Sequence, residues 1–213
     1  MAAILEVERA GRRIDGSWIW RDISLRVEPG CRVGVVGPSG AGKSLFLRAL
    51  AGLDDLQEGD ISFRGERLEN WRMPGYRSRI VYLHQRPPLQ EGSVEDNFRM
   101  VFGFSSNRHK MYDRSKVLSQ LHTLGRAESF LRRSTESLSG GEAQIAALLR
   151  ALQLDPDLLL LDEPAASLDP DSMGRLEELL LGWQSGANDR ALLLTSHDSA
   201  QIERLSTQTL TLK

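Results

Sequence analysis

Apolar and polar residues alternate along the first third of the chain with a period of two, which is typical of half-buried strands. Short apolar runs at residues 4–7 and 61–63 predict further strands, the second of them after a turn at residues 58–60. This part of the chain is therefore expected to be rich in β structure. In the segment 19–27, one predicted face carries Ile19, Ile23, Leu25 and Val27, and the other carries Trp20, Asp22, Ser24 and Arg26.

The pattern changes to helical spacing between residues 86 and 137, where Val117, Leu118, Leu121 and Leu124 fall on one helix face. Two aliphatic runs at residues 158–161 and 192–194 follow, separated by a helix that carries leucines and Trp183. Strands that alternate with helices predict a parallel sheet and an α/β fold.

Composition limits the possible classes of protein. The chain has 213 residues, of which 40% are hydrophobic, and this is enough for one domain with a buried core. Its single cysteine, Cys31, cannot form an internal disulfide, and residues 1–6 lack the pattern of a signal peptide, so a reducing, cytosolic compartment is expected. No apolar run approaches the eighteen or so residues that cross a bilayer. The net charge of −2 argues against a general nucleic-acid binder, and the arginine-rich stretch 64–79 is interpreted as a solvated face.

A glycine-rich segment directly follows the apolar run 33–36 and has the spacing of a phosphate-binding loop. Its glycines allow backbone N–H groups to approach phosphate oxygens, and the helix expected over residues 43–53 presents its positive end. Lys43 is expected to reach the β- and γ-phosphates, and the Ser44 hydroxyl to ligate Mg²⁺. The alternative is an ordinary glycine-rich turn. The predicted phosphate-binding residues are Gly37, Pro38, Ser39, Gly40, Ala41, Gly42, Lys43 and Ser44.

Three further strand ends carry polar residues that would meet the same phosphate, since ligands of α/β sheets bind beyond the carboxyl ends of the strands. Asp162 suits Mg²⁺ binding, and Glu163 suits a general base that activates water. Gln85 offers an uncharged ligand for Mg²⁺ or water, although alone it is an ordinary loop amide. His197 follows the last apolar run, although a lone histidine after a strand is more often a surface or capping residue.

The segment Leu138-Ser139-Gly140-Gly141-Glu142 precedes a helical run at residues 143–152. Ser139 and Glu142 have the spacing of a capping box, and the two glycines at a helix N-terminus also make an exposed anion site. Two anion sites far apart in sequence predict a partner, because two copies placed head to tail would each complete the other's site.

Together these residues resemble the ATP-binding cassette family over nearly the whole chain, in the order phosphate loop, Gln85, residues 138–142, the acid pair, residues 167–169 and His197. The resemblance implies a RecA-like core with a parallel sheet, an N-terminal antiparallel β portion and an inserted helical subdomain. The corresponding division is residues 1–85 and 143–213 for the core and 86–142 for the insert.

The resemblance also assigns roles across a dimer that buries ATP and Mg²⁺ between two copies. It implies that Ser139 and Gly141 contact the γ-phosphate held by the opposite copy, with Gly140 in the same nucleotide-binding segment. It also implies that Asp169 couples the two sites and that His197 contacts the γ-phosphate beside Glu163. Lys43 and Gln85 complete the expected catalytic set.

The chain departs from the family pattern at several positions. Leu45 stands where a hydroxyl residue is usual near the α-phosphate, so the contact there would come from its backbone. The aromatic residue that stacks on adenine is replaced near Arg13 or Ile14, while Trp18 and Trp20 are expected to pack on the β portion. Glu142 and Ile145 replace a more usual Gln and Arg, without removing a catalytic group.

Two classes of cassette remain open. A soluble cassette acts on ribosomes or nucleic acid and usually carries two cassettes in one chain, whereas this chain has one, which favours a transporter subunit. The membrane domain would then be a separate permease, docked on the insert near residues 85–104, with this chain on the cytoplasmic face of the membrane. The spacing of residues 85–97 resembles exporter cassettes and favours export, and the chain as a whole resembles small bacterial cassettes paired with permeases that export iron or another metal; an import-type cassette is the alternative.

Overall fold

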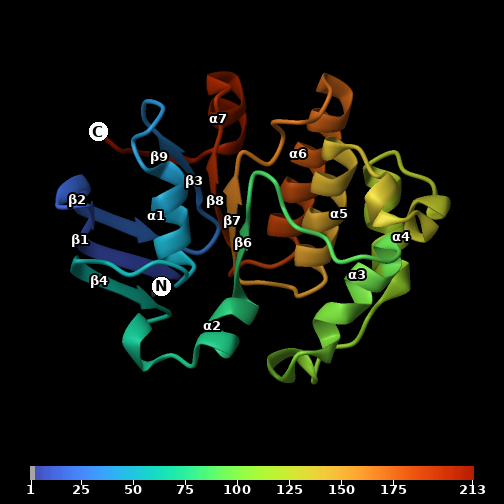
Figure 1. Cartoon of the computed structure of the whole chain (residues 1–213), viewed down its shortest axis with the longest axis horizontal. Coiled ribbons are helices and arrows are strands. Elements are labelled where there is room, and N and C mark those ends of the chain that lie inside the picture. Colours follow the sequence, from blue (N-terminus) through green and yellow to red (C-terminus); the bar gives the residue numbers. More distant parts are fainter. Residues whose placement is uncertain (1–2) are drawn as a thin grey trace.

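The computed structural model describes residues 3–213 and folds them into two sheets with helices around them (Figure 1). The antiparallel sheet has the strand order β2-β1-β4-β5, and the parallel sheet has the order β6-β7-β8-β3-β9. The predicted α/β fold is therefore confirmed. The strands are β1 Leu5–Ile14, β2 Ser17–Val27, β3 Arg32–Val36, β4 Glu58–Phe63, β5 Glu66–Arg67, β6 Ile80–Leu83, β7 Leu158–Asp162, β8 Ala191–Thr195 and β9 Gln208–Thr211.

Seven α-helices are found in the described part of the chain. The first ends three residues earlier than the expected Leu53, because Gly52 takes a left-handed conformation (φ 64°) that terminates the helix. The pattern analysis did not identify α2, α7 or β9. The helices are α1 Lys43–Leu50, α2 Met73–Arg79, α3 Val94–Met100, α4 Arg114–Thr123, α5 Gly140–Leu152, α6 Pro170–Ser185 and α7 Ser199–Leu205.

The parallel sheet lies between two hydrophobic cores. In β7, Leu158 and Leu160 face α1 and the antiparallel sheet, while Leu159 and Leu161 face the helices α4, α5 and α6. Figure 1 shows this arrangement, with α1 and the antiparallel sheet on one side of the parallel strands and α5 and α6 on the other. A strand that is apolar on both faces is packed between two layers, so the position of its carboxyl end is well defined.

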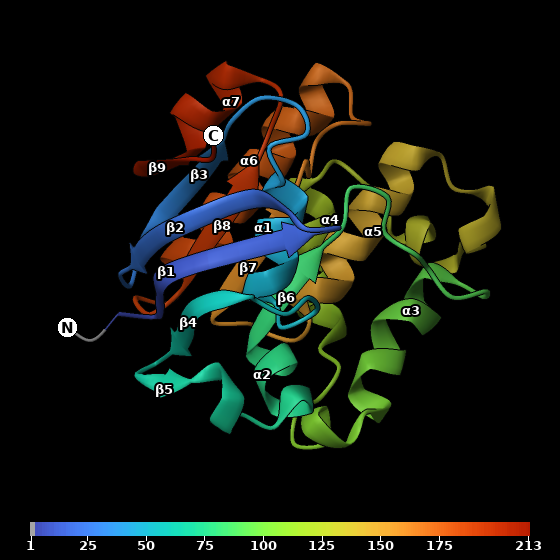
Figure 2. The ribbon, with the colours of Figure 1, turned by 60° about the vertical axis from the view of Figure 1, so that its left-hand side comes forward.

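The antiparallel sheet differs in detail from the expected alternation. Trp20 is expected on the polar face, but it is buried in the core against Phe46 of α1. The reason is a register shift between β1 and β2, with Asp22 in a left-handed conformation (φ 56°), which moves the inward face by one residue. Figure 2 shows β1 and β2 side by side over α1.

The expected turn at residues 58–60 is also wrong. These residues belong to β4, where Asp60 pairs with Glu8 and Glu58 pairs with Gly11. Gly59 has φ 78° beside a register shift in this pair, so the glycine marks a bulge rather than a chain reversal.

The chain between β6 and β7 carries α3, α4 and α5 with short 3-10 turns. Its core side chains, such as Phe98, Leu121 and Leu131, join the same hydrophobic cluster as β7. The division into a core and an insert at residues 86–142 stays a prediction. Within residues 3–213, no helix has both the length and the apolar character needed to span a bilayer.

Candidate active site

Four neighbouring parallel strands end at one edge of the sheet, and each is followed by a residue chosen from the sequence. In spatial order β6 leads to Gln85, β7 to the acid pair, β8 to His197 and β3 to the phosphate loop. Because parallel strands share their carboxyl edge, residues far apart in the sequence are brought to one place.

The phosphate loop is built around glycines that adopt positive φ angles. Gly40 and Gly42 have φ 83° and 79°, and Gly42 is the N-cap of α1. A Cβ atom on Gly42 would lie 2.9 Å from Trp20 and 2.5 Å from Ile19, so a larger residue would displace the loop. Trp20, which the alternation pattern assigns to the polar face, therefore packs against the phosphate loop at Gly42.

The donors of this loop fit an anionic ligand. Lys43 Nζ donates to the carbonyl oxygens of Gly37 (2.9 Å) and Pro38 (3.1 Å), so its charge is satisfied by backbone rather than by a carboxylate. The first turn of α1 has no acidic residue, and Ser44 is exposed there. A positive helix end, an ammonium group and a hydroxyl are suited to phosphate oxygens and the Mg²⁺ that accompanies them.

Glu163 is the centre of the polar cluster at the sheet edge. Gln85 Nε2 donates to its Oε2 (2.8 Å), and His197 Nε2 lies 2.7 Å from its Oε1. The Glu163 side chain is only 14% exposed, against 66% for His197, so the carboxylate lies at the bottom of the cluster. The three residues predicted from separate strand ends are thus in direct contact.

Asp162 lies deeper, at 4% exposure, and both of its carboxylate oxygens accept hydrogen bonds. Tyr82 Oη donates to Oδ2 (2.9 Å), and Thr195 Oγ1 donates to Oδ1 (2.8 Å). Burial, together with the charge of Asp162, raises the pKa of Tyr82, which keeps the phenol protonated as a donor.

Sequence reasoning missed Tyr82 and Thr195. Thr195 pairs with Asp162 in the register of β7 and β8, and Tyr82 belongs to the neighbouring strand β6. A hydroxyl residue at the last position of β8 was visible in the sequence, but its partner is known only once the register is known.

The residues of the segment 138–142 form the expected capping box at the start of α5. Ser139 N donates to Glu142 Oε2 (2.9 Å), and Glu142 N donates to Ser139 Oγ (3.3 Å). Burial alone would raise the pKa of Glu142, but the hydrogen bonds from Ser139 and Arg133 outweigh it and lower this pKa. The carboxylate is therefore held in its charged form.

Asp169 lies beside this helix start, at the N-terminus of α6. Its carboxylate accepts from Ser172 N (2.9 Å) and Ser172 Oγ (2.7 Å), and these bonds lower the pKa of Asp169. A Cβ atom on Gly141 would lie 2.6 Å from the Ser167 carbonyl oxygen, so α5 and the segment 167–169 pack closely. Ser139, Gly140 and Asp169 are exposed, their hydrogen bonds stay within the segments 139–142 and 167–172, and the packing of Gly141 on Ser167 joins these two segments.

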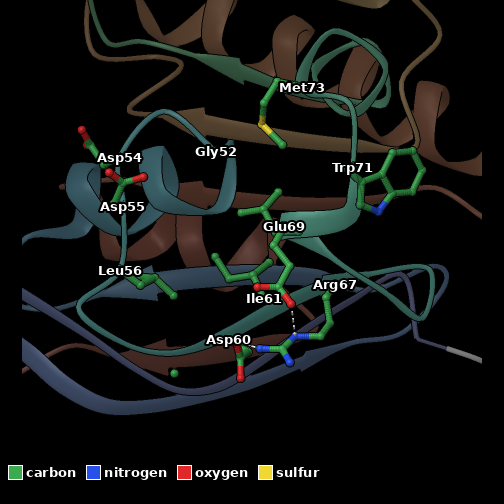
Figure 3. Close-up of a pocket in the computed structure, with 12 residues that line it drawn as sticks. Gly52, Asp54, Asp55, Leu56, Asp60, Ile61, Arg67, Glu69, Trp71 and Met73 are labelled. Atoms are coloured by element: carbon green, nitrogen blue, oxygen red, sulfur yellow. Dashed lines mark hydrogen bonds and ion pairs between the residues drawn. The ribbon is translucent and has the colours of Figure 1, made fainter.

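Two hollows lie on the surface of the described chain near these elements. One of about 290 Å³ borders Glu163 and His197 and reaches Met173 and Gln201. A larger one of about 690 Å³ lies between the end of α1 and β4, where Arg67 is paired with Asp60 and Glu69 (Figure 3). Asp54 and Asp55 also line it, so its walls are acidic and unsuited to phosphate.

No aromatic face takes the usual place for adenine in the described part of the upstream segment. Ile14 is 36% exposed there, and the Arg13 guanidinium lies over the Trp18 ring at 5.6 Å. Trp18 lies on the antiparallel sheet, with Arg21 at 4.7 Å from its ring centre, whereas Trp20 packs against α1. Trp20 lies in the core that the antiparallel sheet shares with α1, so it packs on the β portion as expected and on α1 as well.

The profile of the family described as "ABC transporter" matches residues 20–166. ABC transporter I family member 17 of Arabidopsis thaliana is 35% identical over 192 residues, covering 90% of this chain and 72% of the relative. Phosphate import ATP-binding protein PstB 2 of Bacillus licheniformis is 31% identical, covering 97% and 78%. Lipoprotein-releasing system ATP-binding protein LolD of Syntrophus aciditrophicus is 30% identical, covering 92% and 87%.

Solved structures show the same fold. The cassette cbiO1 of Clostridium perfringens, part of the transporter complex cbiONQ, superposes with a TM-score of 0.84 at 24% identity, covering all of this chain and 86% of that chain. The ATP-binding cassette MJ0796, in a dimeric post-hydrolysis state with ADP and phosphate, gives 0.83 at 21% identity, covering 98% and 94%. The chain therefore belongs to the ATP-binding cassette family, and it is an ATPase that works with ATP and Mg²⁺.

Proposed function

We propose that this chain is the nucleotide-binding subunit of a transporter, in which two copies, placed head to tail, hydrolyse ATP and drive separate membrane subunits. The observation that carries the proposal is the division of the site. Lys43 and the Glu163 cluster gather at one sheet edge, whereas Ser139 and Asp169 are exposed and contact only their own neighbourhood. A second copy can bring the exposed group of one chain to the phosphate loop of the other.

Each residue then has one task on the nucleotide. The loop from Gly37 to Ser44, with the Leu45 backbone, holds the phosphates, and Lys43 adds a positive charge to the β- and γ-phosphates. Ser44, Asp162 and Gln85 hold Mg²⁺, which neutralises phosphate charge when it is bound. From the other copy, Ser139, Gly140 and Gly141 contact the γ-phosphate.

Glu163 acts as the general base for the attacking water, with His197 beside the γ-phosphate. In the structure, both carboxylate oxygens of Glu163 are already engaged, one by Gln85 and one by His197. Each of these oxygens keeps a second lone pair, so the carboxylate can accept a proton from water while Gln85 and His197 hold its orientation.

Mixing two inactive variants tests the head-to-tail site. Lys43→Ala disables the phosphate loop, and Ser139→Arg disables the exposed segment, so each variant alone should hydrolyse almost no ATP. A mixed dimer holds one intact site, built from the unchanged halves of both chains, and an equal mixture should recover about a quarter of the parent rate. An inactive mixture would mean that each chain completes its own site, and would overturn the proposed arrangement.

The membrane partner is proposed to dock on the segment that follows Gln85, which would place the chain on the cytoplasmic face of the membrane. Arg150 Nη2 donates to the Pro88 carbonyl oxygen (2.9 Å), which ties this segment to α5 and so to Ser139. Phe104 and Met111, farther along, are 54% and 88% exposed. Replacing both by serine should reduce co-purification with the permease while ATP binding is unchanged; full co-purification would place the docking surface elsewhere.

We propose export as the direction of transport, on the spacing of residues 85–97, and a metal ion such as iron as cargo, on the resemblance to small bacterial cassettes that are paired with metal-export permeases. Import is the second candidate, because the relatives from Bacillus licheniformis and Haloferax volcanii are named as phosphate and anion import proteins. Transport assays with radioactive iron and phosphate in inside-out vesicles that carry the permease and this chain decide between them. ATP-dependent iron uptake into such vesicles supports export, and ATP-dependent release of preloaded phosphate supports import.

A further inference from the structure

One hydroxyl group joins the two acids of the site. Thr195 is the last residue of β8 and is fully buried. Its Oγ1 donates to Asp162 Oδ1 (2.8 Å) and accepts from the backbone N–H of Glu163 (3.0 Å). Since the backbone N–H can only donate, the single proton of the hydroxyl is left for the Asp162 carboxylate. The directions of both hydrogen bonds are therefore fixed.

Glu163 needs this support because its backbone is unusual. It has φ 50°, a left-handed conformation that is unfavourable for a residue with a side chain. Its N–H is held by Thr195 from β8, and its carbonyl oxygen accepts from Gln144 Nε2 of α5 (2.8 Å). Gln144 is 1% exposed, so both sides of this residue are held by buried groups on different elements.

The backbone conformation of Glu163 decides where its carboxylate points. That carboxylate reaches Gln85 on one side and His197 on the other, so a rotation of the Glu163 backbone would move both contacts. We propose that Thr195 is a positioning residue for hydrolysis, which sets the Asp162 carboxylate and the Glu163 backbone at the same time. The proposal rests on the functions proposed above for Asp162 and Glu163.

Valine has nearly the shape of threonine but offers neither hydrogen bond. In Thr195→Val, kcat should fall about 10- to 100-fold, because a small displacement of a catalytic group has an effect of this size. Affinity for a fluorescent ATP analogue, measured without turnover, should stay within threefold of the parent, since Lys43 and its loop are unchanged. Thr195→Ser, which keeps the hydroxyl, should retain kcat within threefold.

Thr207→Val is the matched control. Thr207 Oγ1 also accepts from one backbone N–H and donates to one carbonyl, both of Arg32, next to the edge strand β9. This variant should keep the parent kcat. Should Thr195→Val not fold, Thr195→Ser against Thr195→Ala gives the same comparison, with the alanine variant expected to be at least tenfold slower.

The outcomes separate the two proposals. A Thr195→Val variant with kcat within twofold of the parent overturns the positioning function, and so does an equal loss in the serine and valine variants, which would reflect packing. Glu163→Gln is measured alongside: if it stays active, the function proposed for Glu163 fails. If Glu163→Gln is inactive and Thr195→Val is not, only the inference about Thr195 fails.

Discussion

The cluster around Glu163 and the segment at Ser139 are both polar and both conspicuous in the sequence, yet they are built in opposite ways. The first draws Gln85, Glu163 and His197 from three strands into direct contact. The second is satisfied by neighbours a few residues away, Glu142 for Ser139 and Ser172 for Asp169. The residues of the first region are thus brought together by the tertiary fold, whereas those of the second make local hydrogen bonds and stay exposed.

This contrast shows which half of the proposed site a single chain can complete. Strand ends on a sheet packed on both faces cannot move far, so a catalytic carboxylate is placed best there. A helix start that is capped by its own residues keeps an exposed face without needing a tertiary partner. The second region is therefore suited to meet a phosphate that another copy holds.

Replacement of Glu163, the proposed general base, should have the largest effect on ATP hydrolysis. Glu163→Gln removes the carboxylate but leaves Lys43 and Ser44, so hydrolysis should fall about 10²- to 10⁴-fold while ATP binding persists. Phosphate release at saturating MgATP measures hydrolysis. An ATP-stabilised dimer, detected by size-exclusion chromatography with light scattering, shows that ATP still binds. Glu178→Gln, at an exposed position of α6, is the control and should match the parent. Hydrolysis within threefold of the parent would remove Glu163 from this function.

The packing of the antiparallel sheet against the phosphate loop should contribute to the free energy of unfolding. Trp20 is 3% exposed and meets the Phe46 ring edge-on at 5.5 Å, so Trp20→Leu should lower the free energy of unfolding by about 2 to 3 kcal/mol. Trp18→Leu, with its ring half-exposed between two arginines, should cost less than about 1 kcal/mol and leave ATP affinity within threefold. Urea unfolding and nucleotide titration check both variants. A tenfold loss of affinity in Trp18→Leu would show that Trp18 contacts the base.

Ser139 allows the cap to be separated from its proposed contact with the nucleotide. Ser139→Ala should lower the free energy of unfolding by about 1 kcal/mol as a lost N-cap, and also reduce ATP hydrolysis more than tenfold. Ser93 makes the same capping box with Asp96 at the start of α3, so Ser93→Ala should show the stability loss alone. Equal ATPase rates in the two alanine variants would reduce Ser139 to a cap.

These contrasts also show how far the sequence alone could lead. Local patterns predicted the phosphate loop, the strands that precede Gln85, Glu163 and His197, and the cap at Ser139, because each depends on neighbours in the chain. Trp20 was misplaced because a bulge at Asp22 is a property of the pairing with β1, which alternation cannot reveal. Thr195 was missed for the same kind of reason: its partner Asp162 is set by the register between β7 and β8.

The smallest expected effect concerns Glu142, whose carboxylate belongs to the second region. Its pKa is lowered in the folded chain, so the ionised form stabilises the fold above the ordinary glutamate pKa of 4.5, and this contribution is lost as pH falls through the lowered value. Glu142→Gln keeps an acceptor for Ser139 but cannot ionise, so at pH 7 it should lower the free energy of unfolding by no more than about 1 kcal/mol. Below the lowered pKa the parent and the variant should unfold at the same denaturant concentration, because the parent has then lost the same charge. Urea unfolding from pH 7 to pH 3 measures the difference, with Glu136→Gln at an exposed neighbouring position as the control. A gap between parent and variant that widens toward low pH would contradict the expected sign, and would mean that Glu142 is held in its neutral form beside Ser139.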